Sequence, residues 1–368
     1  MSSIYGNQLR ISIFGESHGE AIGTVVDGFP AGVAVDFDFI RAQMARRRPS
    51  GGAFSTKRHE TDDFRILSGI RDGRTTGAPI CAVMENGDTH SQDYDNLTDM
   101  PRPSHADYPA MVRYKGANDP RGGGHFSARL TAPLVFAGSL CRSFLRTRGI
   151  ELIAHIASIA DVADEVFDLC RIGGGEAERI AQNELPVLSA EAGERMLALI
   201  RAARSAGDTL GGVVECAVTG MKPGCGSPMF GSVESALSSL LFSIPAVKGV
   251  EFGSGFGIAA LRGSEANDPY YSENDQIKTR FNHNGGILGG ITTGMPIVFR
   301  AAFKPISSIA QPQRTLNLKS GNEETLVVRG RHDICVVPRA VPVVENAAAI
   351  AVCDLLLEEY GYEGLANV

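Results

Sequence analysis

Apolar and polar residues alternate in several short segments, a pattern typical of half-buried β-strands. A valine-rich version of the same pattern occurs in the second half, and a glycine-punctuated strand is expected from Val250 onward. The predicted strands are 9–14, 21–26, 78–84, 150–159, 210–219, 296–303 and 324–328. The pattern therefore predicts β-strands in both halves of the chain.

Longer segments between these strands repeat apolar residues at the helical period and carry helix start and stop signals. Asp36 is a predicted N-cap for a helix through Ala45, and Pro342 suits the first turn of a closing helix that ends at Tyr360, before Gly361. The other predicted helices are 127–148, 189–205 and 233–242. Three polar segments, 49–61, 171–186 and 268–280, are predicted to be loops or surface excursions.

Strands and helices mix along the whole chain, so the fold class is predicted to be α/β with α+β character. No Pro/Ser-rich linker interrupts the 368 residues, so residues 1–368 are expected to form a single domain. Each half offers strands and two or more long helices, which suggests pseudo-duplicated halves. No sequence repeat accompanies this suggestion.

Composition narrows the class of protein. A net charge of −7 with no long basic run argues against nucleic-acid binding. The seven cysteines are scattered, with no CxxC pair, which is typical of reduced thiols in the cytoplasm. The N-terminal segment lacks the pattern of a signal peptide, and no apolar stretch is expected to span a membrane. Arginine clusters in such an acidic chain indicate capture of a small anion.

Three short segments place imidazoles and a carboxylate among glycines and arginines: 15–19 with His18, 102–108 with His105, and 329–333 with His332 and Asp333. Histidine gives or takes a proton near neutral pH. Each segment also has an ordinary interpretation. His18 would then be a surface histidine, His105 an incidental neighbour of a capping Ser104, and Asp333 half of a structural ion pair.

Two further features favour anion binding. The predicted helix that starts at Asp36 delivers Arg46, Arg47 and Arg48 at its C-terminal end, where solvated cations are also common. The segment 121–129 joins a glycine turn to a helix start near Ser127, a device that binds anions. A second glycine loop, 282–290, has two interpretations. Its backbone either lies close to a flat ligand or forms tight turns with no ligand role.

The sequence lacks the common motifs of metal-binding sites. The eight histidines include no HExxH and no HxH, and no EF-hand spacing occurs, so no catalytic metal is expected.

Taken together and in order, the segments resemble the chorismate synthase family. The matching motifs are FGESHG (14–19), VDGFPAG (26–32), RRRPS (46–50), DYPAMVRYKGANDPRGGG (107–124), SIPAVKGVEFGSGF (243–256), NHNGGILGGI (282–291), FKPISSI (303–309) and GRHDIC (330–335). No single motif is decisive, but eight in register are highly specific.

The resemblance implies a lyase that eliminates phosphate from 5-enolpyruvylshikimate 3-phosphate by anti-1,4-elimination, giving chorismate in the shikimate pathway. It implies a requirement for reduced FMN without net redox change, a β-α-β sandwich fold and a homotetramer. NADPH would be needed only if the chain also reduced its flavin. Otherwise a separate flavin reductase would be a partner.

The resemblance also assigns roles to residues of this chain. His18 would protonate the departing phosphate, His105 would protonate the reduced flavin, and Asp333 would help flavin N5 take up the substrate proton. The anionic groups of the substrate would be held by Arg48, Arg121, Arg129, Arg331 and Arg339. Flavin contacts would fall on His125, Phe126, Ser127, Pro245, Ala246, Gly289, Lys304, Pro305, Ile306, Ser307, Ser308 and Arg331.

Two other functions stay open at the level of sequence. A flavin reductase or another flavoprotein oxidoreductase would consume NADPH with FMN and no substrate. A non-catalytic binder of phosphorylated metabolites would be indifferent to the loss of His18 and His105.

Overall fold

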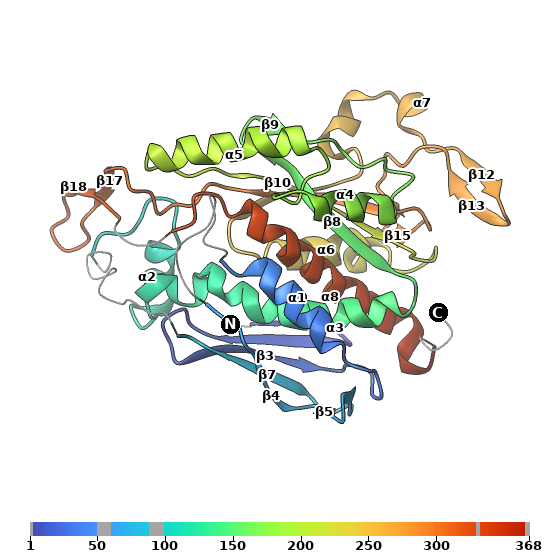
Figure 1. The fold of residues 1–368 in the computed structure, drawn as a ribbon, viewed down its shortest axis with the longest axis horizontal. Coiled ribbons are helices and arrows are strands. Elements are labelled where there is room, and N and C mark those ends of the chain that lie inside the picture. Colours follow the sequence, from blue (N-terminus) through green and yellow to red (C-terminus); the bar gives the residue numbers. More distant parts are fainter. Residues whose placement is uncertain (1–2, 50–59, 88–98, 329–331, 365–368) are drawn as a thin grey trace.

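The computed structural model describes residues 3–49, 60–87, 99–328 and 332–364. Two five-stranded sheets form the outer β layers of a sandwich with helices between them (Figure 1). The first sheet has the order β1 (Ile4–Tyr5), β2 (Arg10–Gly15), β3 (Ala21–Asp27), β7 (Ile80–Glu85) and β4 (Arg65–Ser68). The second has the order β11 (Val247–Phe252), β16 (Ile297–Phe303), β10 (Gly212–Thr219), β8 (Glu151–Ile159) and β9 (Val162–Ala163). Neighbouring strands in both sheets are antiparallel.

The middle layer contains α1 (Phe37–Arg47), α3 (Thr131–Arg146), α6 (Val233–Leu241) and α8 (Val337–Gly364) (Figure 1). On the far side of the second sheet lie α4 (Gly174–Gln182) and α5 (Ala190–Ser205). One hydrophobic cluster runs from the first sheet through α3 and α8 into the second sheet. The α8 helix is apolar and long enough to span a membrane, but its apolar window is 100% buried, as in the core helix of a globular protein.

The two sheets share one topology, so the predicted β-α-β sandwich with pseudo-duplicated halves is confirmed. In the first half the chain runs β2, β3, α1, β4, β7, α3, and in the second it runs β8, β10, α6, β11, β16, α8. The spatial orders correspond, because β2-β3-β7-β4 matches β8-β10-β16-β11. Each half therefore contributes one long helix, α3 or α8, to the centre.

A buried carboxylate ties the central helices together. Glu345 of α8 accepts hydrogen bonds from Arg142 of α3 at 2.7 Å and from Arg46 of α1 at 2.5 Å. Its other oxygen accepts from the backbone N–H of Ala154 in β8 at 3.1 Å. Burial alone would raise the pKa of Glu345, but the charges of Arg142 and Arg46 outweigh it and lower that pKa. Arg46 thus links α1 to α8 through Glu345 and is not among the residues that line the cavity described below.

The remaining elements are small. They are β5 (Ile70–Arg71), β6 (Arg74–Thr75), α2 (Asp107–Tyr114), η2 (Arg121–Phe126), η3 (Ala128–Leu130), η4 (Met229–Gly231), η5 (Gly255–Ala260), α7 (Gly263–Ala266), β12 (Tyr270–Glu273), β13 (Gln276–Thr279), β14 (Ile287–Leu288), β15 (Ile291–Thr292), β17 (Gln313–Leu316) and β18 (Glu323–Leu326). Asp36 caps α1 as predicted, accepting from the N–H of Phe39 at 2.9 Å. Most predicted strands lie within a few residues of their expected bounds.

Several local predictions were wrong. The closing helix begins at Val337 rather than near Pro342, because Pro338 already occupies its first turn and Pro342 is accepted inside the helix. The 268–280 segment forms the β12–β13 hairpin rather than a plain loop, whereas 171–186 is largely exposed as predicted and contains the short helix α4. Ser127 caps the short η3 turn, and α3 starts only at Thr131. Most of the predicted 49–61 loop lies outside the described residues.

Candidate active site

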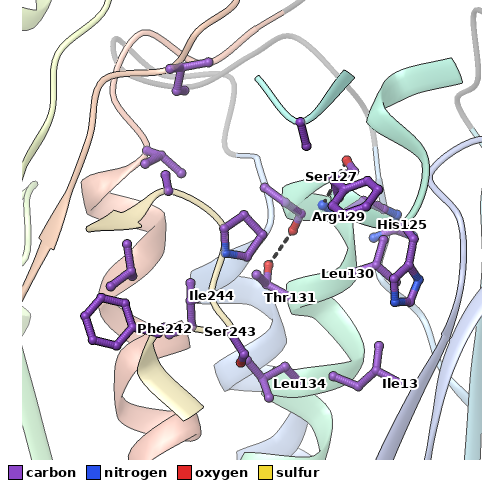
Figure 2. A pocket seen from close by; sticks show the side chains of 18 of the residues that line it. Ile13, His125, Ser127, Arg129, Leu130, Thr131, Leu134, Phe242, Ser243 and Ile244 are labelled. Carbon is purple, nitrogen blue, oxygen red and sulfur yellow. Dashed lines mark hydrogen bonds between the residues drawn. The ribbon is translucent and has the colours of Figure 1, made fainter. Parts of the chain in front are cut away.

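A cavity of about 910 Å³ opens between the two halves of the sandwich. Figure 2 shows one wall, which carries His125, Ser127, Arg129 and Thr131, facing another that carries Phe242, Ser243 and Ile244. The first wall precedes and begins α3, and the second follows α6. The volume is at the upper end of the ~300–1,000 Å³ range of ligand pockets, so more than one small molecule fits.

A triple-glycine turn shapes the floor of the cavity. Gly122, Gly123 and Gly124 have φ values of +60°, +84° and +55°, a region that L side chains rarely adopt. A Cβ on Gly124 would lie 2.1 Å from the carbonyl oxygen of Asp119. The N–H of Ser17 donates to the carbonyl of Gly124 at 3.1 Å, which brings the 15–19 loop against this turn.

The two histidines predicted as acids lie over neighbouring glycines of this turn. A Cβ on Gly122 would be 2.6 Å from Nε2 of the buried His18, and one on Gly123 would be 3.5 Å from Nε2 of His105. His105 and Gly122 both line the cavity, whereas His18 is buried behind Gly122 and is not among the lining residues. The structure thus brings together two imidazoles that are 87 positions apart in the chain.

His105 belongs to a compact group of charged side chains. Its Nδ1 is 2.5 Å from Oδ1 of Asp107, and Arg102 donates a hydrogen bond of 2.8 Å to each carboxylate oxygen of Asp107. Burial alone would raise the pKa of Asp107, but hydrogen bonds from Arg102 and His105 hold that pKa well below its usual range. The carboxylate is therefore ionised at neutral pH.

The side chains of the arginine run 46–48 take three different positions, and Arg48 is not among the residues that line the cavity. Arg48 is exposed and donates to the carbonyl of Thr61 at 3.3 Å, whereas the buried Arg47 lines the cavity. Arg47 pairs with Asp62 at 3.0 Å. Burial lowers the pKa of Arg47 to about 10, so the guanidinium stays charged at neutral pH.

Arg129 is at the cavity wall, as predicted for substrate binding. It pairs with Asp62, with Glu60 at 3.3 Å, and donates to Oδ1 of Asn86 at 3.1 Å. Arg121 behaves differently: its side chain is 51% exposed, forms an ion pair with Asp119 at 2.7 Å, and is not part of the cavity lining.

Asp333 and Arg339 lie together at another part of the wall. Their side chains form an ion pair, and Nε of Arg339 donates to the backbone carbonyl of Arg47 at 2.8 Å. Arg331, predicted to contact both substrate and flavin, lies outside the described residues. Arg339 thereby links the start of α8 to the end of α1 beside the cavity.

Most of the predicted flavin contacts line the cavity. They are His125, Phe126, Ser127, Pro245, Ala246, Lys304, Ile306, Ser307 and Ser308. The N–H of Lys304 donates to the carbonyl of Ala246 at 2.9 Å, which joins two of these segments. Burial, together with the charge of Lys248, lowers the pKa of Lys304.

Two predicted flavin residues are not in the lining. Pro305 is exposed between lining neighbours. Gly289 belongs to the loop whose Gly290 carbonyl accepts from the N–H of Val233 at the start of α6. The cavity lies at the other end of α6, roughly 13 Å away for nine residues at 1.5 Å each. Gly289 is thus not part of the cavity within one chain.

The structure adds site residues that the motifs did not single out: Arg47, Glu60, Arg102 and Lys248. Arg47, Arg102 and Lys248 stand in segments already noticed, and the close spacing of Arg102 and Asp107 in the chain was an available signal. Nothing in the local sequence marks Glu60. Among the described residues, no group of three or more His, Cys, Asp or Glu side chains is arranged to hold a metal.

The two-sheet fold and its cationic, histidine-bearing cavity are those of an anion-binding enzyme with acid–base groups at its site. A sequence profile described as Chorismate synthase matches residues 9–357. The chain is 46% identical to a chorismate synthase of Thermococcus kodakarensis over 363 residues, covering 98% of this chain and 99% of the relative. It is 44% identical to one of Dehalococcoides mccartyi over 357 residues, covering 97% of each.

A solved structure described as the crystal structure of chorismate synthase superposes with a TM-score of 0.76 at 27% identity. The match covers 99% of this chain and 96% of that one. The chain belongs to the chorismate synthase family, the carbon–oxygen lyases that form chorismate in the shikimate pathway.

Proposed function

We propose that the chain eliminates phosphate from 5-enolpyruvylshikimate 3-phosphate by anti-1,4-elimination, with reduced FMN bound and no net redox change. The observation that carries this proposal is the packing of His18 and His105 against the Gly122–Gly123 turn, beside a cavity that His105 and buried arginines line. The substrate carries two carboxylates and one phosphate. An acidic chain that concentrates cations at one cavity is suited to such a ligand.

The cations at the wall would hold the substrate. Arg47, Arg129 and Arg339 line the cavity, and each guanidinium is held in place by a carboxylate or a backbone carbonyl. Arginine offers a planar fork of donors that fits carboxylate and phosphate oxygens. Arg48, Arg121 and Arg331 remain predicted contacts only.

The residues present also fit FMN. The cavity has room for a flavin beside the substrate, and Nε of the buried Arg47 has no hydrogen-bond partner among the described residues. Such a buried donor favours an anionic or oxygen-bearing ligand. The segments 125–127, 245–246 and 304–308 would hold the flavin, with Lys304 and Lys248 supplying positive charge for its phosphate.

When bound, reduced FMN would supply an electron-rich ring system that assists departure of the phosphate and ends the cycle unchanged. His18 would give a proton from Nε2 to the leaving phosphate, and His105 would hold a proton at Nε2 on the side of the cavity. Asp333, fixed by Arg339, would guide removal of the ring proton. Positioned donors of this kind typically contribute ~10²–10³-fold to turnover.

An anaerobic assay tests this proposal. The full chain is mixed with 5-enolpyruvylshikimate 3-phosphate and chemically reduced FMN, and chorismate formation is followed by absorbance. We expect product with reduced FMN and none with oxidised FMN. A preparation that consumes NADPH with FMN alone, and forms no chorismate, would instead be a flavin reductase. If reduced FMN supports turnover without NADPH, a separate reductase in the cytoplasm is the expected source of reduced flavin.

We also propose that the chain assembles as a homotetramer. Large apolar side chains of the second half are exposed, among them Met229 (77%), Phe230 (91%), Phe256 (86%) and Ile277 (72%). Large apolar side chains exposed to this extent favour contact with another protein surface. Light scattering should give four times the mass of one chain, and Phe230→Glu with Phe256→Glu should lower that mass. A monomeric wild-type chain would refute the assembly.

A further inference from the structure

The turn that carries His105 is fixed by side chains outside the predicted machinery. Arg102 donates through Nε and Nη2 to both oxygens of Asp107 at 2.8 Å, and the backbone N–H of Arg102 donates to Oδ2 at 3.0 Å. Asp107 Oδ1 in turn lies 2.5 Å from Nδ1 of His105. One carboxylate therefore binds both the arginine and the imidazole.

The same turn is anchored to the opposite wall. Nη1 of Arg102 donates to Oγ of Ser308 at 3.1 Å. The hydroxyl of Ser307 donates to the carbonyl of Ser104 at 2.8 Å. Ser104 has a φ of +57°, an unusual conformation for a residue with a Cβ, and such conformations persist where surrounding contacts enforce them. Several independent contacts, from Asp107, Ser307 and Ser308, thus hold the turn that carries His105 in one position.

We propose that Asp107, held by Arg102, is a positioning residue that accepts from Nδ1–H of His105 and directs the Nε2–H of the ring to the cavity. The inference rests on the proposed function, in which His105 is a proton donor. A histidine that donates from Nε2 while its Nδ1–H is also bound carries a proton on both nitrogens. An ionised carboxylate accepts from Nδ1–H and holds the ring in that orientation, as in other histidine–carboxylate pairs.

The contacts argue against the opposite arrangement. Nη2 of Arg102 is 3.0 Å from Nδ1, but a guanidinium only donates, so it would have to meet a lone pair there. The shorter 2.5 Å contact is to Asp107, whose pKa is held low by hydrogen bonds from Arg102 and His105 that outweigh its burial. Donation from Nδ1–H to Asp107 is therefore the favoured arrangement. Nε2 then lies on the side of Gly123, at the cavity.

A double-mutant cycle tests the proposal in the anaerobic assay. Asp107→Asn should lower kcat on the order of 10²-fold with little change in KM or in FMN affinity, because the fault is in proton transfer. In a His105→Ala background the same substitution should change kcat by no more than about twofold, since Asp107 acts through His105. Arg102→Lys, which keeps the charge but loses the fork, should give an intermediate loss.

A matched control removes another carboxylate bound to an arginine. Glu165 pairs with Arg179 at 2.7 Å on the exposed outer layer, so Glu165→Gln should leave kcat unchanged. The melting temperature of each variant shows whether a loss of activity comes from misfolding or from a displaced His105 ring. The proposal would be overturned if the double variant lost kcat by the product of the two single losses. It would also be overturned if the kcat loss of Asp107→Asn were accompanied by matching losses of melting temperature and FMN affinity. If wild type makes no chorismate, the proposed function fails; if only the cycle fails, Asp107 is merely structural.

Discussion

At the scale of single residues, the glycines of the 122–124 turn let the rings of His18 and His105 pack close to the backbone. Gly122 lies under the ring of His18, and a Cβ there would be 2.4 Å from Cδ2. Real side chains do not approach so closely, so the imidazole would have to move. Displacements of about 1 Å at reacting groups can cost ~10²-fold in rate.

Gly122→Ala should therefore lower turnover about 10²-fold, in addition to a loss of stability from its positive φ. Gly73→Ala is the matched control, because Gly73 has a φ of +73° and a Cβ on it would meet nothing within 4 Å. Both variants should lose ~1–3 kcal/mol of unfolding free energy from backbone strain. Equal kcat values for the two variants would contradict the placement of His18 against the turn.

The identity of most site residues was predictable, but the direction of neighbouring side chains was not. His105, Arg129 and Asp333 line the cavity as expected. Consecutive helical residues point about 100° apart, so the run Arg46–Arg48 had to split, and its composition does not say which member faces inward. The pairing of Arg47 with Asp62 decides it, and that pairing is a tertiary contact.

At the scale of elements, a buried charge cluster fastens the outer helices to the second sheet. His155 of β8 is 3.0 Å from Asp164 through Nδ1 and 3.0 Å from Glu215 of β10 through Nε2. Asp164 also accepts from the N–H groups of Leu188 and Ser189 at the start of α5. Burial alone would lower the pKa of His155, but the hydrogen bonds to both carboxylates outweigh it and raise that pKa.

The raised pKa of His155 determines how the unfolding free energy should change with pH. The stabilisation from charged His155 is fully present below its ordinary pKa of about 6.5 and is lost as pH rises through the higher folded-state value. His155→Gln should therefore cost ~3–5 kcal/mol of unfolding free energy at pH 6 and less at pH 9. Denaturant titrations at the two pH values measure this.

His283→Gln provides the comparison. Its ring nitrogen meets the hydroxyl of Ser254 at 2.9 Å rather than a carboxylate, so a loss of only ~1 kcal/mol is expected. A His155 variant that loses more stability at pH 9 than at pH 6 would show that the buried imidazole is not charged.

Elements with strong capping and periodic signals were predictable, and weakly patterned ones were not. Asp36 and Ser189 cap α1 and α5 as the sequence indicates. The β12–β13 hairpin is largely exposed on both faces, so it has no clear apolar period to detect. The α4 helix begins with two glycines, which have low helix propensity, and it buries only Ile180.

At the scale of the whole molecule, the two halves meet where α3 and α8 pack backbone to backbone. A Cβ on Gly138 of α3 would lie 2.3 Å from the carbonyl oxygen and 2.4 Å from the Cβ of Asn346 on α8. Both helices also carry cavity residues at their starts. Separation of these helices would therefore disturb core and site together.

Gly138→Ala should lower the unfolding free energy by about 3 kcal/mol, because overpacking against backbone outweighs a helix-propensity gain of ~1 kcal/mol. Gly175→Ala in α4, where nothing lies within 4 Å, should instead be neutral or slightly stabilising. Chemical denaturation checks both, and the predicted single domain requires one cooperative transition. Separate transitions for the two halves would refute it.

The proposed reaction eliminates phosphate from one bound substrate without consumption of reduced flavin. Phosphate, chorismate and reduced FMN can be followed together in one anaerobic reaction of the full chain. We predict equimolar release of phosphate and chorismate over many turnovers, with the reduced FMN concentration unchanged at the end. Phosphate release without chorismate, or loss of one reduced FMN for each product formed, would contradict the proposed reaction.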